Sequence, residues 1–160
     1  MTDREFLEAT DNWMRLANGE QLECDSCYVK FIGCWVAFNA HLNRRYPDLL
    51  TRDRAKIDKQ REDGASVEAH RNRLNMSSDY ESAIQTLAEH GVASESGLRK
   101  NICSPENWSE VLDCVYLVRC NLFHGGKQQN SERDGELVEA SLQIMLEVCQ
   151  YERSRISASF

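Results

Sequence analysis

Proline is nearly absent from this chain, and glycine is scarce. The 160 residues include only 2 prolines and 8 glycines, so little in the sequence interrupts regular helices. Long apolar runs are also missing, since no stretch approaches the ~20 residues that a membrane-spanning helix needs. The first five residues are polar and acidic, unlike a secretory signal peptide. We therefore expect a cytoplasmic protein rich in helix, with no membrane span.

The signs of a disulfide framework are lacking too, although cysteine is plentiful. The 7 cysteines are odd in number, and most lie in apolar helical stretches, which indicates reduced thiols in a cytosolic protein. Cys24 and Cys27 form a lone CxxC pair, with no second pair and no nearby histidine pair. Because a structural zinc site needs four ligands, we expect no metal centre, and the sequence implies no cofactor.

The alternating pattern of a strand never persists for more than four residues, and helical spacing dominates instead. Phe6, Ala9, Trp13 and Leu16 form one apolar stripe, which ends at Asn18-Gly19. A central helix is predicted over about residues 23–46, with Trp35 and Phe38 in the core. Further helices are expected at residues 80–87, ending at His90-Gly91 after an N-cap near Ser77, at 104–123 from Ser104-Pro105, and from 132–136 onward, with a frayed tail at 153–160.

These patterns predict an all-α fold in a single domain of residues 1–160. We expect a helical bundle of four main helices plus one or two short helices. A polar insertion around residues 51–77 interrupts the apolar pattern. There we predict one short helix at 54–61, a loop at 63–66, and the most mobile part of the chain.

The same region is the one basic part of an acidic protein. Residues 52–73 hold seven basic and five acidic side chains, a local charge of +2 in a chain of net charge −7, which leaves −9 for the remainder. Such a segment is either a solvated surface of mixed sign or a local strip that guides phosphates. The overall negative charge argues against a broad, sequence-independent hold on nucleic acid.

Residues 119–127, Arg-Cys-Asn-Leu-Phe-His-Gly-Gly-Lys, carry the most chemistry. Arg119 has a permanent charge that can hold a phosphate, and His124 can move a proton near neutral pH. In an ideal helix, with 100° per residue, the two side chains would point ~140° apart. They share one cleft only if the helix ends near Gly125-Gly126 or if a second subunit contributes. The alternative is a structural arginine with an acidic partner and an exposed histidine.

This segment resembles the signature of the HEPN superfamily, an Arg followed by four to six residues and a His. Residues 31–40, Phe-Ile-Gly-Cys-Trp-Val-Ala-Phe-Asn-Ala, resemble the long core helix of one bacterial branch of the superfamily. Residues 132–138, Glu-Arg-Asp-Gly-Glu-Leu-Val, resemble the last helix of that branch. The likeness covers about half of the chain, in the right order.

The resemblance implies a helical homodimer in which two Arg/His pairs line one cleft. It also implies a metal-independent endoribonuclease, in a superfamily that includes toxins and phage-defence proteins. Arg119 and His124 would be catalytic, and cleavage would leave a 2′,3′-cyclic phosphate and a 5′-OH. Asn121 and Lys127 would either bind the RNA substrate or simply lie at a solvated helix end. An antitoxin or other regulatory protein is a further partner that the resemblance allows. The alternative function is a non-catalytic interaction or regulatory module of the same fold.

Two positions depart from the superfamily pattern. Cys120 follows the arginine where many members have a polar residue, often Asn, and here Asn121 comes one step later. Gly126 replaces a Tyr that is modified in the toxin branch paired with a nucleotidyltransferase antitoxin, so that modification is not implied. The other histidines, His41, His70 and His90, lack ligand-type neighbours and are predicted at the surface or at helix ends.

Overall fold

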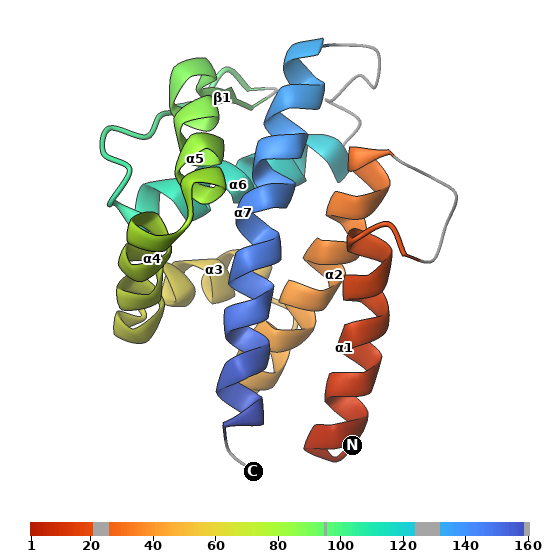
Figure 1. The fold of residues 1–160 in the computed structure, drawn as a ribbon. Coiled ribbons are helices and arrows are strands. Elements are labelled where there is room, and N and C mark those ends of the chain that lie inside the picture. The colour runs from red at the N-terminus through yellow and green to blue at the C-terminus, as the bar shows by residue number, and fades with distance from the viewer. Residues whose placement is uncertain (21–25, 95, 124–131, 159–160) are drawn as a thin grey trace.

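The computed structural model of this chain describes residues 1–20, 26–94, 96–123 and 132–158. In these residues the fold is all-α, as predicted, with seven α-helices, one 3₁₀ helix and one small antiparallel hairpin (Figure 1). The elements are α1 (Asp3–Ala17), α2 (Cys27–Arg45), η1 (Pro47–Leu49), α3 (Asp53–Glu62), α4 (Gly64–Met76), α5 (Ser78–His90), β1 (Val92–Ala93), β2 (Arg99–Lys100), α6 (Trp108–Phe123) and α7 (Glu132–Ser157).

Helices α2 and α7 pack side by side at the centre of the bundle. Helix α1 covers the outer side of α2, and α5 packs against the other side of α7. Helix α6 crosses behind α7 and packs against α3 and the hairpin, and both chain termini lie at the same end of the molecule (Figure 1). None of the helices in the described ranges combines the length and the apolar composition needed to cross a bilayer.

The core confirms the central apolar stripe. Trp35 and Phe38 of α2 are buried, as predicted, and their rings lie 5.4 Å apart in an edge-to-face arrangement. Trp108 at the start of α6 is also buried, and its indole nitrogen donates to the backbone carbonyl of Gln60, 3.1 Å away. The Trp108 indole thus joins the start of α6 to the end of α3.

Several helix ends follow the local signals in the sequence. The hydroxyl of Ser77 accepts a hydrogen bond from the Tyr80 amide at 3.2 Å and caps α5. Gly91 ends this helix with a φ of 63°, which favours glycine. His90, the last residue of α5, lies at a helix end as expected, and its Nε2 is 2.7 Å from the Glu136 carboxylate of α7.

Three helix predictions need correction. In α1 the buried face contains Phe6, Leu7 and Thr10, whereas Trp13 is 42% exposed, so the stripe is rotated from the predicted one. Helix α6 begins at Trp108 rather than at Ser104-Pro105, because the Ser104 hydroxyl bonds to Glu106 instead of capping the helix.

The C-terminal tail is the third correction, because α7 continues to Ser157 where fraying was predicted. The Arg153 guanidinium forms a two-pronged ion pair with the Asp11 carboxylate of α1, at 2.7 and 2.8 Å. Arg155 also lies 3.3 Å from the Asp63 carboxylate. These pairs hold the last turns of α7 against the rest of the bundle.

Residues 51–77 form two helices, so the loop predicted at 63–66 is wrong. Asp63 caps α4 by accepting from the Ser66 amide at 2.9 Å. The buried contacts of α3 and α4 are largely polar. Gln60, for example, donates to Ser66 and to Glu152 of α7, at 2.8 and 2.9 Å. Apolar spacing missed α4 because hydrogen bonds, rather than large apolar side chains, hold it in place.

Two of the remaining histidines are buried, contrary to the prediction. His70 of α4 is inaccessible to solvent, and its Nε2 lies 2.8 Å from the Pro105 carbonyl. A carbonyl only accepts, so Nε2 carries the proton and Nδ1 accepts from the Tyr80 hydroxyl at 2.8 Å. His41 is 4% exposed and packs edge-on against Phe6. Burial lowers the pKa of each imidazole to about 4.

Candidate functional site

The candidate site lies at the C-terminal end of α6. Along one line of this helix the exposure rises from buried Leu112, through half-buried Tyr116, to Phe123, which is 50% exposed. Arg119 belongs to this line, and its side chain is 21% exposed. The sequence therefore places the Arg119 charge where the core meets the surface.

Aromatic rings surround the Arg119 guanidinium. Its Cζ lies 4.7 Å from the centre of the Phe123 ring, 5.8 Å from that of Trp35 and 6.0 Å from that of Tyr116. The rings stabilise the positive charge but accept few hydrogen bonds. The Nε atom is buried and has no hydrogen-bond partner in the described part of the chain. The guanidinium is thus held in place while part of its donor capacity is unused.

The acidic partner of Arg119 is Asp53, the first residue of α3. One carboxylate oxygen lies 3.6 Å from Arg119 Nη2, and the other lies 2.9 Å from Lys56 Nζ. Lys56 is fully buried and also donates to the side-chain oxygens of Asn39 and Asn43, at 3.0 and 2.5 Å. The Arg119 charge therefore belongs to a polar network that extends through α3 to the central helix α2.

This network answers two open questions from the sequence. Asn39 interrupts an apolar helix, and its partner is the Lys56 ammonium group. The polar 52–73 segment is not simply a solvated surface of mixed sign, because Lys56 points into the protein. Asp53 itself was missed as a site residue, since no local pattern links it to an arginine so much farther along the chain.

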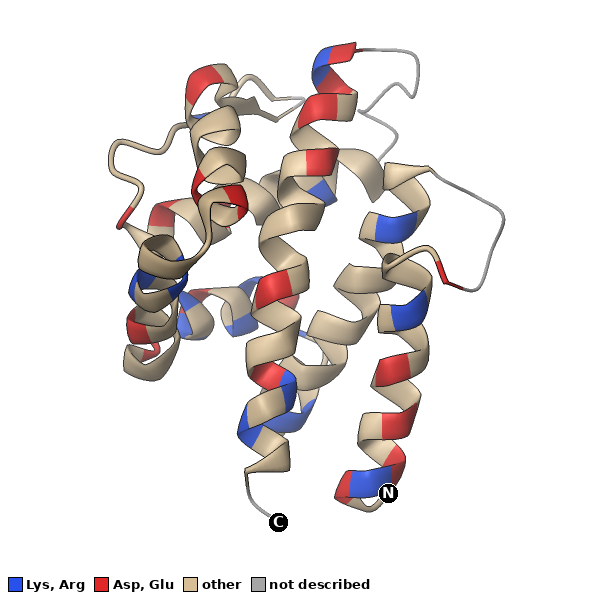
Figure 2. Ribbon diagram, in the orientation of Figure 1, with Lys and Arg blue, Asp and Glu red and all other residues tan. Residues whose placement is uncertain are grey.

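A second group of charges lies next to the first, on α3 and α6. The carboxylate of Asp113 is 5% exposed and contacts Arg54 at 2.7 Å, Lys100 at 3.0 Å and Arg61 at 3.7 Å. Burial alone would raise the pKa of Asp113, but the hydrogen bonds from Lys100 and Arg54 outweigh it, so the pKa is lowered. Figure 2 shows basic residues along α3, which therefore serve partly to neutralise buried acid.

Tyr116 connects the two charge groups. The Arg54 Cζ lies 5.5 Å from the centre of its ring, on which Arg119 also lies. Burial, followed by the neighbouring Cys120 thiol, raises the pKa of Tyr116 to about 12. The phenol therefore keeps its proton at neutral pH and acts as a donor rather than as a base.

Asn121 does not lie with Arg119. The side chain is 6% exposed, and its amide nitrogen donates to the Ala93 carbonyl of β1, 2.7 Å away. Two residues apart on a helix means a rotation of ~200°, which places Asn121 on nearly the opposite face. This contact fastens the hairpin to α6, and the contact of Asn121 with substrate stays a prediction.

The other predicted site residues lie outside the described residues. These are His124 and Lys127, together with Gly125, Gly126 and the Cys24 of the CxxC pair. The structure thus describes the arginine half of the predicted catalytic pair. In the described ranges, no three histidine, cysteine or acidic side chains are grouped as ligands for a metal ion.

No protein-family model, curated protein or solved structure matches this chain.

Proposed function

We propose that this protein is a metal-independent endoribonuclease of the HEPN type, with Arg119 and His124 as its catalytic pair. The observation that carries the proposal is the position of Arg119. Its guanidinium lies over three rings, and its Nε has no hydrogen-bond partner among the residues that the structure describes. The Arg119 side chain remains partly exposed, five residues before His124. Such a fixed, incompletely paired cation suits an anionic substrate.

The proposed reaction uses the RNA as its own nucleophile. His124 takes the proton of the 2′-OH, whose oxygen attacks the adjacent phosphorus, and the 5′-oxygen of the next nucleotide leaves with a proton. Arg119 stabilises the negative charge that develops on the phosphoryl oxygens. The products are a 2′,3′-cyclic phosphate and a 5′-OH, and atoms balance without a metal ion. Lys127 remains a candidate contact for a flanking phosphate.

Assembly and context belong to the same proposal. We place the active form in the cytoplasm as a homodimer, with the two Arg/His pairs in one cleft. A toxin or phage-defence role, controlled by an antitoxin or another regulatory protein, follows from the family resemblance alone.

A non-catalytic interaction module of the same fold is the second candidate. The observation in its favour is that Arg119 already has an anionic neighbour in Asp53 and three aromatic partners. An arginine with such neighbours can be structural. Cys120, whose sulfur lies 4.0 Å from Arg119 Nη1 in place of the usual polar residue, also favours this candidate.

The deciding experiment is cleavage of total RNA and tRNA in excess EDTA, with analysis of the fragment ends. Wild-type protein should cleave, whereas Arg119→Ala and His124→Ala should each lose at least ~100-fold in rate. Arg4→Ala and His90→Ala are matched controls, because they remove an exposed arginine and a helix-end histidine elsewhere. If all five proteins cleave equally, Arg119 and His124 are not the catalytic pair. If none of them cleaves, the non-catalytic interaction module is favoured.

A further inference from the structure

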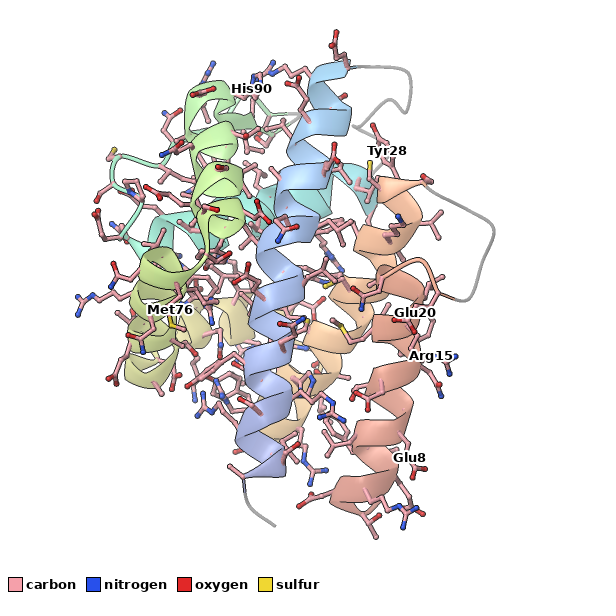
Figure 3. The ribbon with its side chains drawn as sticks, in the orientation of Figure 1. Glu8, Arg15, Glu20, Tyr28, Met76 and His90 are labelled. Carbon is pink, nitrogen blue, oxygen red and sulfur yellow. The ribbon has the colours of Figure 1, made fainter. Side chains whose placement is uncertain are left out.

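A feature that the proposed function does not use lies away from α6, between α4 and α7. A cavity of about 600 Å³ opens there, with the first residues of α5 at one end. This volume lies within the range of pockets that bind small molecules. Ala65, Ala69 and Met76 of α4 and Tyr151 of α7 supply an apolar wall. Met76, labelled in Figure 3, is 86% exposed on α4.

Among the residues that the structure describes, Arg73 is the one cationic side chain that lines the cavity. Its Cζ lies 5.2 to 5.8 Å from the ring centres of Tyr80, Trp108 and Tyr151. In the part of the chain that the structure describes, the Nε and Nη1 atoms of Arg73 are buried and have no hydrogen-bond partner. The guanidinium also interacts with the Tyr80 hydroxyl. Leaving buried N–H groups unpaired costs free energy, which the aromatic rings offset only in part.

We propose that this cavity binds a small organic carboxylate with a flat apolar body, and that Arg73 binds the carboxylate group. The fork of N–H groups on an arginine matches a carboxylate geometrically and electrostatically. The apolar wall and the Tyr151 ring would cover the body of the ligand. Asn72 and Gln150, which also line the cavity, would bind a polar edge of it.

The two acidic side chains of the lining disfavour a dianion more strongly than a monoanion. Glu68 and Glu147 border the same cavity, so a ligand with two negative charges meets repulsion. Glu147 is engaged at short range, because its carboxylate accepts from the Ser77 hydroxyl at 2.7 Å. A phosphate monoester should therefore bind less tightly than a carboxylate of the same size.

The test compares a charged probe with its neutral isostere on the intact protein. Calorimetry and ligand-observed NMR would measure the affinity of indole-3-acetate and of indole-3-acetamide, with AMP as the phosphate probe. We expect indole-3-acetate to bind about 10-fold or more tightly than the amide, and AMP to bind more weakly than indole-3-acetate. Equal affinities for acid and amide, or no binding by either at millimolar ligand, would overturn the assignment.

Two variants test whether Arg73 is the group that binds the ligand carboxylate. Arg73→Met keeps an unbranched stem among the rings and should abolish the preference for the acid. Arg71→Met is the matched control, since Arg71 is exposed on the same helix and does not line this cavity. A preference that survives in folded Arg73→Met protein would refute the role of Arg73. The comparison of acid and amide on wild-type protein needs no variant, so it still decides the proposal if Arg73→Met does not fold.

Discussion

Lys56 is a buried side chain whose contacts connect several parts of this fold. Lysine is almost never fully buried unless it is paired, and here its ammonium group binds Asn39, Asn43, the Leu50 carbonyl and Asp53. Lysine donates three hydrogen bonds, so these acceptors share all of its capacity. The same group fixes the carboxylate that faces Arg119, and Lys56 thus links the stability of the bundle to the candidate site.

Replacing Lys56 with methionine should therefore destabilise the protein. The variant removes the donor to two half-buried amide oxygens and to the Asp53 carboxylate. It should lower the free energy of unfolding by about 2–4 kcal/mol. Urea denaturation followed by circular dichroism measures this. Lys59→Met is the control, because Lys59 is exposed on the same helix and surface changes usually stay within about 0.5 kcal/mol. A loss for Lys56→Met no larger than that of the control would contradict the network.

Residue patterns predicted the core well and the charged contacts poorly. Trp35 and Phe38 were placed correctly because burial of a helix face repeats with the helical period. The Arg119–Asp53 pair and the buried Lys56 were missed, since they depend on helices that meet only in the folded protein. The contact of Asn121 was missed for the same reason, because its partner, the Ala93 carbonyl, lies in a hairpin with no sequence signature.

At the scale of elements, His70 connects α4 to α5 and to the loop before α6. Its two ring nitrogens bind Tyr80 and Pro105, and the imidazole must be neutral for Nδ1 to accept. Burial, with a further contribution from the Arg73 charge, lowers the pKa of His70 to about 4. The unfolded chain, with an ordinary histidine pKa of ~6.5, binds a proton first as the pH falls. Stability due to His70 is thus complete above pH ~6.5 and declines until pH ~4.

The prediction concerns His70→Gln, whose amide can donate to Pro105 and accept from Tyr80 without titrating. Between pH 6.5 and pH 4 the wild-type protein should lose about 2–3 kcal/mol more stability than this variant. Urea unfolding of both proteins across this pH range measures the difference in their stability. The contributions of the acidic groups that both proteins share cancel in this difference. If the free energies of unfolding of the two proteins change with pH in parallel, His70 does not titrate as proposed. His41→Gln tests the second buried imidazole in the same way.

The boundaries of elements also show where sequence patterns stop being informative. Helices α2 and α5 were predicted because apolar spacing, Ser77 and Gly91 mark them clearly. Helix α4 was not, since its buried groups include Ser66 and His70 and its packing depends on hydrogen bonds. A polar helix of this kind has the composition of a loop, so only its tertiary contacts reveal it.

At the scale of the whole molecule, the helical spacing of Arg119 and His124 favours a site that is shared between two subunits. If α6 were extended ideally, the two side chains would point ~140° apart, and a second subunit can supply the missing partner. The active protein should then be a dimer with twice the 18.4 kDa chain mass in light scattering at micromolar concentration. A strict monomer that cleaves RNA would rule out a site that needs two subunits.

Mixing variants tests whether the pair forms between subunits. In a dimer of one Arg119→Ala chain and one His124→Ala chain, an arginine and a histidine from different chains still form one intact pair, whereas neither chain has an intact pair of its own. After random exchange about half of the dimers are mixed, each with one of two sites restored, so up to about a quarter of wild-type activity should return. No recovery, in a mixture shown by mass to exchange subunits, would mean that Arg119 and His124 act within one chain. In that case the chain after Phe123 must turn back toward the Arg119 guanidinium, and the cleft needs no second copy.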